Sequence, residues 1–479
     1  MSEDGDRTFL DRPMTSLHLL LVSGGLLLGI GLVMVLSASM VESYVDFGSA
    51  YGVFKKQLMW VVIGIPVFWL ALRMPPRAYH AIAYPALLTS VALLAVVLVP
   101  GIGTLLNGSR RWIDFGPLQL QPSEPAKLAF ALWGAAMLVR KEKVLRAWKH
   151  LLVPLVPLAC LVCGLVMLEP DLGTTLCFVL ILFGLLWTVG APMRMFGAMF
   201  AAACGAILLL ILVEPYRLAR LTSFLHPFSD SGNGGYQAVQ GLYGLATGGF
   251  FGVGLGQSRQ KWGLLPNAHT DYIFAILGEE LGLVGCLVVL ILFATLAYAG
   301  TRIARRSADP FVRLVAGACT VWLAGQAVIN MGYVTGLLPV TGIPLPLISF
   351  GGTSLVVTLF VLGMLGSFAR HEPAAVAHLS ARGPSRIARW LRLPAPKPYQ
   401  ERRPRRAPAR PAPPRPGRPR GARTPDRPTT RAAERPAPAP NRRPGQPGST
   451  VPVRPARSAG PGPAARLRAT GTDGRPRGR

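Results

Sequence analysis

The sequence has few charged residues, and acidic ones are especially scarce. Only 15% of its 479 residues are charged, against about a quarter in typical soluble proteins. Hydrophobic residues make up 51% of the chain. A chain with so few charged residues cannot cover its surface with polar side chains, as a soluble enzyme must. Its high apolar content is also unlike that of a wholly disordered protein. We therefore expect the lipid bilayer to be its natural solvent.

Cysteine is also scarce, with six residues that all lie inside apolar runs. Cys160 and Cys163 have the CxxC spacing of a redox or metal site, but no second pair and no histidine cluster follows them. Buried small side chains are the better interpretation. A disulfide scaffold is excluded, and no spacing indicates a dedicated metal site.

The positive charge is concentrated at the C-terminal end. Residues 371–479 hold 26 Lys and Arg against five acids, and 24 of the 44 prolines. This segment cannot bury enough apolar surface to fold alone, so we expect a disordered tail. It is either a solvated extension attracted to anionic lipids or a docking segment for an acidic cytoplasmic partner. Without interleaved aromatic residues, nothing favours nucleic-acid binding.

The body, residues 17–370, contains apolar runs long enough to span a bilayer. Because lipid offers the backbone no hydrogen bonds, each run should be helical, which predicts an all-α polytopic membrane protein. A short segment, 1–16, precedes the first run and is not net basic, so we expect an uncleaved span. The ten predicted spans are 17–39, 57–73, 79–100, 123–140, 151–168, 172–190, 195–213, 271–299, 311–335 and 352–369.

The basic residues of the short loops predict the orientation. Loops 73–78, 140–150 and 300–310 carry most of them, which places these loops and both termini in the cytoplasm. The long loops 101–122 and 214–270 are then extracytoplasmic and rich in glycine and polar residues. We expect the chemistry of the protein on that outer side.

Ionisable residues at membrane depth are functional candidates. Glu124 and Lys127 are three residues apart and share a helix face, either as a local ion pair or as the polar lining of a cavity. Glu279 and Glu280 lie within a predicted span and need partners, for which Lys127 is one candidate.

Two acids are placed by an outer turn. Glu169 and Asp171 flank Pro170 between two predicted spans. Because Asp171 directly precedes the second span, its side chain can accept hydrogen bonds from the first backbone N–H groups of that helix. Helix capping is therefore favoured over catalysis for Asp171.

Asp271 is the sharpest candidate for chemistry. It opens the apolar run of a predicted span on its outer side. A helix N-terminus favours the carboxylate over the acid, and an ionised carboxylate at a lipid–water boundary is a good general base. The alternative is an ordinary acid at a helix N-terminus.

Five ordered motifs within residues 15–370 resemble those of the SEDS (shape, elongation, division and sporulation) proteins. The resemblance is greater to the division branch, FtsW of actinobacteria, than to the elongation branch, RodA. Asn267 departs from the Glu that many members have at that position. The motifs are 121–127, 169–174, 235–240, 265–282 and 339–352.

The resemblance implies a ten-helix peptidoglycan glycosyltransferase that polymerises lipid II, a disaccharide-peptide on undecaprenyl pyrophosphate, at the outer face of the cytoplasmic membrane. It implies Asp271 as the catalytic base of an inverting transfer. Residues carried over as substrate-binding are Arg110, Arg111, Glu124, Lys127, Gln237, Gln240, Lys261, His269, Thr270, Ser349, Gly351 and Gly352. The resemblance gives no settled role to seven further motif residues: Glu169, Asp171, Glu279, Glu280, Thr341, Pro344 and Pro346.

The departing pyrophosphate needs cations. Arg110, Arg111, Lys261 or a divalent ion, Mg²⁺ or Mn²⁺, could supply them, and such an ion would be held jointly with the substrate phosphates.

The resemblance also implies a class B penicillin-binding transpeptidase and other division proteins as partners, at the division septum. The alternatives are a lipid II flippase and a division scaffold that acts through its tail. No clear repeat among the spans supports a transporter.

Overall fold

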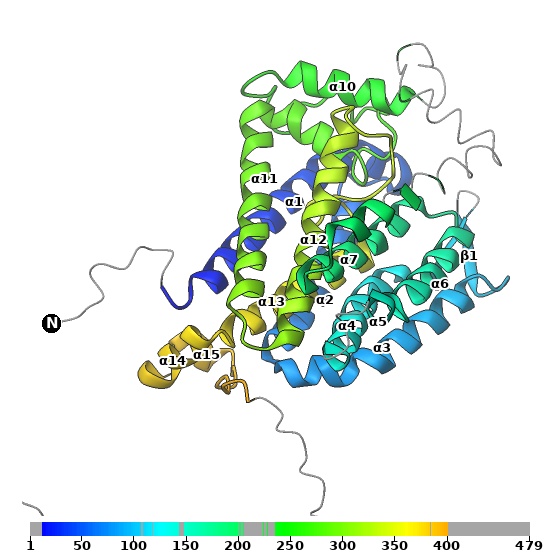
Figure 1. Cartoon of the computed structure of the whole chain (residues 1–479). Helices are drawn as coiled ribbons and strands as arrows, with labels where there is room; N and C mark the ends of the chain where they lie inside the picture. Colours follow the sequence, from blue (N-terminus) through cyan, green and yellow to red (C-terminus); the bar gives the residue numbers. More distant parts are fainter. Residues whose placement is uncertain are drawn as a thin grey trace, which may run out of the picture. The chain divides into compact units, whose positions relative to one another are not determined.

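The computed structural model describes residues 12–106, 109–116, 118–142, 148–199, 201–202, 205, 224, 228, 235–383 and 385–400. This part of the chain is built almost entirely from helices (Figure 1). The helices are α1 (Thr15–Phe47), α2 (Gly52–Arg73), α3 (Pro76–Val97), α4 (Ser123–Arg140), α5 (Trp148–Leu152), α6 (Leu155–Leu168), α7 (Leu172–Val189), α10 (Tyr236–Gly248), α11 (Ile273–Arg306), α12 (Pro310–Val334), α13 (Gly352–Arg370), α14 (Pro373–Arg382) and α15 (Arg386–Trp390). The strands are β1 (Gly103–Leu106), β2 (Ser109–Asp114) and β3 (Gln119–Leu120).

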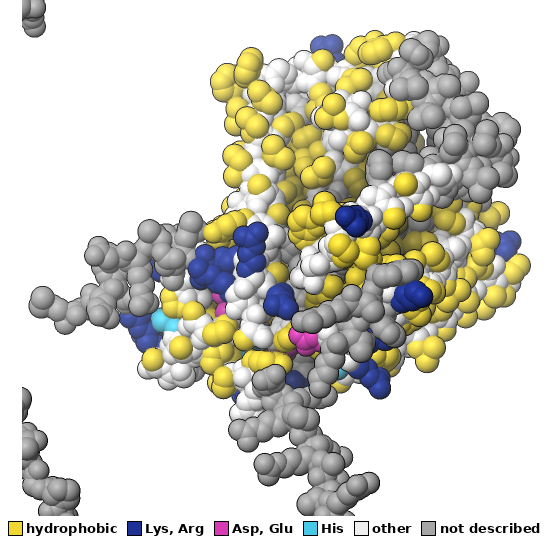
Figure 2. Space-filling view, viewed as in Figure 1, with side chains coloured by type: hydrophobic (Ala, Val, Ile, Leu, Met, Phe, Trp, Pro, Cys, Tyr) yellow, Lys and Arg dark blue, Asp and Glu magenta, His cyan; other side chains and the backbone are white. Residues whose placement is uncertain are grey.

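Among the described residues, seven helices are long and apolar enough to cross a membrane: α1, α2, α3, α7, α11, α12 and α13. Their outward faces carry exposed large apolar side chains, such as Leu287, Leu290 and Ile291 on α11. Figure 2 shows hydrophobic side chains over the upper half of the view and Lys and Arg gathering in the lower half. Exposed apolar faces of this kind are what a helix bundle presents to lipid.

Nine of the ten predicted spans correspond to helices, because α4 and the 14-residue α6 match two further runs. The remaining predicted span, 195–213, lies largely outside the described residues. The count of ten therefore stays a prediction. The apolar runs were correctly interpreted as helices, although α1 and α11 both extend well beyond the ends predicted for them.

The helical prediction is confirmed, and the fold contains one small sheet besides. The predicted loop 101–122 contains an antiparallel three-stranded sheet in the order β1-β2-β3. Thr104 pairs with Trp112, and Ile113 pairs with Leu120. The sheet leads directly into α4 and thereby gives the arginines of β2 fixed positions.

Small residues let the central helices pack closely. Helix α12 packs against α7 and α11, while α13 packs against α2. A Cβ atom added to Gly184 of α7 would lie 2.9 Å from the Cα of Ala318 on α12. One added to Gly363 of α13 would lie 2.3 Å from the carbonyl oxygen of Phe68 on α2. Such close backbone approach is typical of helix packing in membranes.

The disordered tail was predicted to begin at residue 371, but the structure has two helices after that position. Helices α14 and α15 follow α13 almost at once. The indole Nε1 of Trp69 donates to the carbonyl of Leu391 at 2.9 Å, and Arg370 donates to the carbonyl of Pro394 at 2.8 Å. Two side chains of the helical body thus hold the backbone of the segment 371–400. Residues 401–479, to which the prediction also applied, lie outside the described part of the chain.

Candidate active site

Asp271 lies in the turn that leads into α11. The helix begins at Ile273, so Asp271 precedes its first turn. Its backbone carbonyl accepts hydrogen bonds from Nδ2 of Asn330 at 2.9 Å and from the hydroxyl of Tyr333 at 2.8 Å. Both donors belong to α12. The backbone of Asp271 is thus fixed by a neighbouring helix, while its side chain remains partly accessible.

The electrostatics of Asp271 differ from the prediction. Burial, reinforced by the charge of Asp171, raises the pKa of Asp271 to about 6, although His269 and Arg111 oppose this rise. The helix N-terminus was predicted to favour the carboxylate, but Asp271 precedes the helix and its partial burial has the larger effect on the pKa. A carboxyl with a pKa near 6 is still mostly ionised at neutral pH and matches the requirement for a general base.

The loop between α12 and α13 forms a wall beside this carboxylate. Gly342 has a φ of +68°, and a Cβ added there would lie 3.5 Å from Oδ2 of Asp271. The carbonyl of Ile343 accepts hydrogen bonds from Asn330 at 2.7 Å and from Tyr333 at 2.9 Å. The same two side chains therefore hold both the Asp271 turn and the loop that faces it. Sequence reasoning missed Asn330 and Tyr333, which lie inside an apolar span without a charge to mark them.

Two carried-over residues hold this loop, Ser349 through its side chain and Pro344 through its backbone. The Oγ atom of Ser349 accepts from the backbone N–H of Leu345 at 2.8 Å, and the carbonyl of Pro344 accepts from Gln326 at 2.9 Å. Pro346 is buried, and Thr341 is half-buried. These contacts fit a structural role for Ser349 and Pro344, whereas the buried hydroxyl of Thr341 has no hydrogen-bond partner among the described residues.

Gly351 and Gly352 tie the end of the loop to α2. The N–H of Gly351 donates to Oε1 of Gln57 at 3.4 Å. A Cβ added to Gly352 would lie only 2.4 Å from the indole ring of Trp60. No side chain fits at Gly352, so its glycine permits close packing between α13 and α2.

The arginines of β2 differ in their surroundings. Arg111 donates through Nε to the carbonyl of Glu169 at 2.8 Å and also contacts the carbonyl of Pro170. Its guanidinium lies 3.8 Å from Oδ2 of Asp171. Arg110, next to it on β2, is half-buried and pairs across the sheet with Leu105. Arg111 therefore fixes the 169–171 turn next to the Asp271 region.

The capping role predicted for Asp171 is confirmed. Its Oδ1 accepts from the backbone N–H of Thr174 at 2.9 Å, and its Oδ2 accepts from the Thr174 hydroxyl at 2.8 Å. Glu169 is completely buried, and neither of its carboxyl oxygens has a hydrogen-bond partner among the described residues. Burial raises the pKa of Glu169 to about 8, so this carboxyl is mostly protonated at neutral pH.

His269 has a partner that the sequence did not suggest. Its Nδ1 lies 2.8 Å from Oε2 of Glu42, near the end of α1. Its ring packs edge-on against Phe350 at 5.5 Å, and its carbonyl accepts from the N–H of Phe350 at 3.0 Å. His269 thus joins α1, the Asp271 turn and the α12–α13 loop. Glu42 could have been noticed as an acid near the end of an apolar run, but nothing near it in the sequence points to His269.

The remaining outer candidates pack around the same turn. The hydroxyl of Thr270 donates to the carbonyl of Asn267 at 3.2 Å. On α10, Gln237 donates to the carbonyl of Pro266 at 3.4 Å, and Gln240 is half-buried. Helix α10 therefore borders the segment that carries Asp271.

Glu124 and Lys127 form the local ion pair that was one of the two predicted alternatives. Lys127 Nζ lies 2.8 Å from Oε1 of Glu124, and both side chains are buried. The ammonium also lies 5.0 Å from the ring centre of Trp322 on α12. Because Lys127 is occupied in this way, the prediction that it might serve Glu279 or Glu280 was wrong.

The partner of Glu280 is instead Lys261. The two side chains are buried, with Nζ 3.5 Å from Oε1 of Glu280, and Lys261 also donates to the carbonyl of Gly256. Ser37 of α1 donates to both carboxylate oxygens of Glu280, at 2.6 and 2.7 Å. Lys261 is therefore held inside the bundle, which argues against its predicted role as a cation for the departing pyrophosphate.

Glu279 is satisfied by the same loop. It accepts hydrogen bonds from the hydroxyl of Ser258 and, at 3.0 Å, from the backbone N–H of Arg259. Burying two neighbouring carboxyl groups is costly unless each has partners. The segment 249–263 supplies those partners to both glutamates and is thereby fixed against α11.

A break in α11 completes this arrangement. Gly282 has a φ of +67°, which interrupts the helix. The backbone of the preceding glycine-rich segment fills the break: Val253 donates to the carbonyl of Glu279 at 3.0 Å, and Leu283 donates to the carbonyl of Gly249 at 2.9 Å. Non-helical backbone inside a membrane protein needs such compensation. The glycines of 248–256 permit this close approach.

The described residues do not fit a dedicated metal centre. No group of three or more His, Cys, Asp and Glu side chains comes together in them. The Asp171 carboxylate, which is near Asp271, is already occupied by Thr174 and Arg111. A divalent cation remains a proposal that depends on substrate phosphates for its ligands.

The fold and the site define a multi-pass membrane protein with a partly buried carboxylate at one end of its bundle. Comparisons with known proteins give the family. The family model described as "Cell cycle protein" (FtsW, RodA and SpoVE) matches residues 17–374, and the chain belongs to this family.

The relatives support the same assignment. Proteins named "Probable peptidoglycan glycosyltransferase FtsW" from Mycobacterium bovis and Mycobacterium tuberculosis are each 49% identical over 391 residues, which is 82% of this chain and 75% of theirs. Stage V sporulation protein E of Bacillus subtilis is 38% identical over 354 residues, or 74% of this chain and 97% of that protein. Of these relatives, the two FtsW proteins have the higher identity.

Solved structures have the same fold. One, reported as "Structural coordination of polymerization and crosslinking by a peptidoglycan synthase complex", matches with a TM-score of 0.62 and 28% identity over 74% of this chain and 97% of that one. The rod shape determining protein RodA of Thermus thermophilus matches with a TM-score of 0.55 and 29% identity, covering 74% of this chain and 96% of that one.

Proposed function

We propose that this protein is a peptidoglycan glycosyltransferase that polymerises lipid II into glycan strands during cell division. Family membership and the names of the FtsW relatives support this activity. The observation that carries it is the Asp271 carboxylate, whose pKa of about 6 and partial exposure suit a base at the mouth of a membrane bundle. The polyprenyl tails of the substrates would lie in lipid, beside the apolar helices.

Asp271 is the general base of the proposed reaction. Its carboxylate takes the proton from the 4-hydroxyl of the acceptor sugar as that oxygen forms a bond to the anomeric carbon of the donor. The bond from that carbon to the pyrophosphate of the donor breaks, the pyrophosphate leaves with the bonding electrons, and the configuration inverts. The backbone hydrogen bonds from Asn330 and Tyr333 hold the base in place while the substrates bind.

Arg110 and Arg111 are the cations proposed for the departing pyrophosphate. Both are half-buried residues of β2, and Arg111 is close enough to Asp271 to lower its pKa. Lys261 is a poorer candidate, because it is buried against Glu280. A divalent cation bound with the substrate could add to the two arginines, but the protein offers it no ligand set of its own among the described residues.

The proposed orientation places Asp271 outside and both termini in the cytoplasm. The basic residues at the other end of the bundle, including Arg140 and Arg306, support it through the positive-inside rule. A class B penicillin-binding transpeptidase is the proposed partner at the division septum. The similarity to a structure reported as a peptidoglycan synthase complex supports this partnership.

The function is tested by polymerisation of purified lipid II with full-length protein, in the presence and absence of a class B transpeptidase. Asp271→Asn should lower the rate by about 10²- to 10⁴-fold, the usual contribution of a general base. Asp114→Asn is the matched control, since Asp114 is an exposed acid of β2 on the same side. Normal polymerisation by Asp271→Asn would refute the assignment, whereas equal losses in both variants would indicate general damage.

The flippase alternative predicts a different result. A transport path through the bundle would use the buried charges, but Lys127, Glu280 and Lys261 are paired with one another or with neighbours. If Asp271→Asn moves lipid II across vesicle membranes at the wild-type rate and the wild-type protein forms no polymer, the transporter replaces the enzyme. Polymer formation by the wild type favours the glycosyltransferase.

A further inference from the structure

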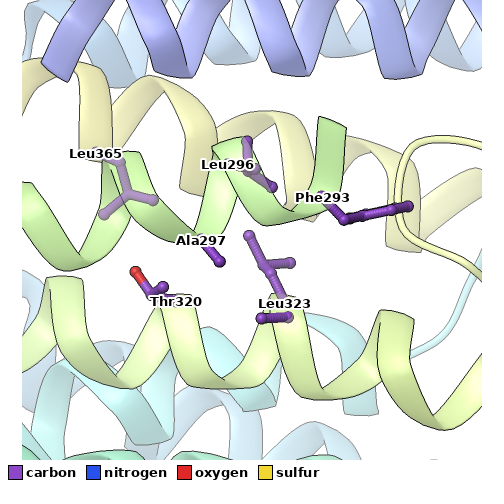
Figure 3. Close-up of a pocket in the computed structure, with 7 residues that line it drawn as sticks. Phe293, Leu296, Ala297, Thr320, Leu323 and Leu365 are labelled. Carbon is purple, nitrogen blue, oxygen red and sulfur yellow. The ribbon is translucent and has the colours of Figure 1, made fainter. Parts of the chain in front are cut away.

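A large cavity lies at the opposite end of α11 from Asp271. It has a volume of about 1070 Å³ and is bordered by the start of α3, the end of α4, the α11–α12 turn and segment 394–400. Ligand pockets usually measure about 300–1,000 Å³. By contrast, the pocket between α11 and α12 in Figure 3, lined by Phe293 and Leu323 among others, holds only about 10 Å³. Of these two, the large cavity has room for a ligand.

The lining of the large cavity is positively charged. Arg77, Arg140 and Lys397 line it, and among the described lining residues Asp309 is the one acid. Asp309 caps α12, with Oδ1 accepting from the backbone N–H of Phe311 at 2.9 Å, so part of its charge is already compensated. The net charge favours an anionic ligand.

Two histidines also line the cavity, and His371 adds little charge at neutral pH. His80 packs edge-on against Phe311 at 5.0 Å, and His371 follows α13. Burial lowers the pKa of His371, with a further contribution from Arg370, although Asp309 opposes this change. The anionic preference of the cavity therefore rests on the two arginines and the lysine.

Apolar side chains accompany the cations. Tyr84, Val139, Phe311 and Val312 line the same cavity, and Tyr84 is exposed toward the surroundings of α3. A small inorganic anion would leave the exposed Tyr84 and the half-buried Val139 without an apolar partner. A lipid, whose charged head group continues into hydrocarbon, satisfies both kinds of lining.

The first part of the tail covers one side of the cavity. Pro394, Pro396 and Pro398 stiffen this segment, and Arg370 anchors it through the carbonyl of Pro394 at 2.8 Å. The sequence that follows is strongly basic. Like charges repel, so the rest of the tail is a poor occupant for this cavity.

We propose that this cavity binds the phosphate-bearing head group of an anionic phospholipid. Arg77 and Arg140 contact the phosphate, Lys397 approaches it from the covering segment, and the acyl chains extend along α3 and α4. The lipid would link the ends of these helices to the start of the tail. This site is separate from the chemistry at Asp271, so its test does not depend on the proposed enzymatic activity.

The test measures lipid retention by full-length protein. The protein is reconstituted in phosphatidylcholine nanodiscs that contain a minority of phosphatidylglycerol or cardiolipin, released, and examined by native mass spectrometry. Wild type should retain the anionic lipid selectively. Each Lys or Arg near a lipid surface strengthens binding about fivefold, so Arg77→Gln/Arg140→Gln should retain it roughly 30-fold more weakly.

The matched control removes the same charge elsewhere. Arg194→Gln/Arg313→Gln changes two exposed arginines that do not line the cavity. It should retain lipid like wild type, and Arg77→Lys/Arg140→Lys should recover most of the binding if the Gln variant is folded. Equal retention by the cavity and control Gln variants would overturn the proposal. So would displacement of the lipid by inorganic pyrophosphate at comparable concentration, because the site would then recognise a soluble anion.

Discussion

Replacing Asp271 by Asn should stabilise the protein while removing its activity. Burial shifts the pKa of this carboxyl from 3.8 to about 6, so the folded state disfavours the ionised form. Each pKa unit corresponds to about 1.4 kcal/mol, which sets an upper limit of about 3 kcal/mol. Since the side chain is only partly buried, solvent screening should reduce the gain to about 1–2 kcal/mol. Asn has nearly the same shape and keeps the backbone contacts.

The pH dependence identifies the cause of this gain. A raised carboxyl pKa stabilises the folded state at low pH, where the group is protonated, and this contribution is lost as the pH rises through about 6. The advantage of Asp271→Asn should therefore be constant above about pH 6 and shrink between pH 6 and pH 4. The polymerisation rate of the wild type should fall over the same range as the base becomes protonated.

The assay is thermal unfolding of both proteins in detergent at matched heating rates, from pH 4 to pH 8, because unfolding of such proteins is often irreversible. A gain of 1–2 kcal/mol should raise the midpoint by roughly a few degrees. A variant that is less stable at pH 7, or a difference that does not change with pH, would refute the view that Asp271 is an ionised and desolvated base.

Three other substitutions test the surroundings of the site. Glu42→Gln should weaken the charge-assisted contact to the neighbouring histidine and slow polymerisation about 5- to 10-fold, with rescue by Glu42→Asp, whereas Asp46→Asn on the same helix should have no effect. Asn330→Ala should lower thermal stability by about 1–3 kcal/mol and reduce kcat more than it raises KM, because the base is released from α12; an unchanged kcat would contradict this. Gly352→Ala should destabilise the fold by about 1–3 kcal/mol through overlap with the indole ring of α2, while Gly25→Ala, which has open space, should not; equal unfolding temperatures would exclude the overlap.

Local patterns in the sequence were enough to predict the features that depend on neighbouring residues. The apolar runs predicted most of the helices, because lipid leaves the backbone no other choice. The spacing of Glu124 and Lys127 allowed their ion pair, and the turn before α7 predicted the capping role of Asp171. Each of these features depends on residues no more than a few positions apart.

Contacts between distant residues could not be predicted in the same way. Glu280 is paired with Lys261 and Ser37, and His269 with Glu42, across long stretches of sequence. Charge alone left Lys127 as an equally reasonable partner for the glutamates. Likewise, the rise in the pKa of Asp271 depends on how deeply the folded chain buries it, which helix periodicity does not reveal.

The break at Gly282 makes two parts of the chain dependent on each other. The upper portion of α11 precedes Gly282, and the longer lower portion follows it. The two portions are connected through this glycine and through the segment that contains Gly249 and Val253. A change in the conformation of that segment would change the angle between the two portions and shift Asp271 with the upper one. The break at Gly282 therefore couples the position of the base to the conformation of the glycine-rich segment that fills it.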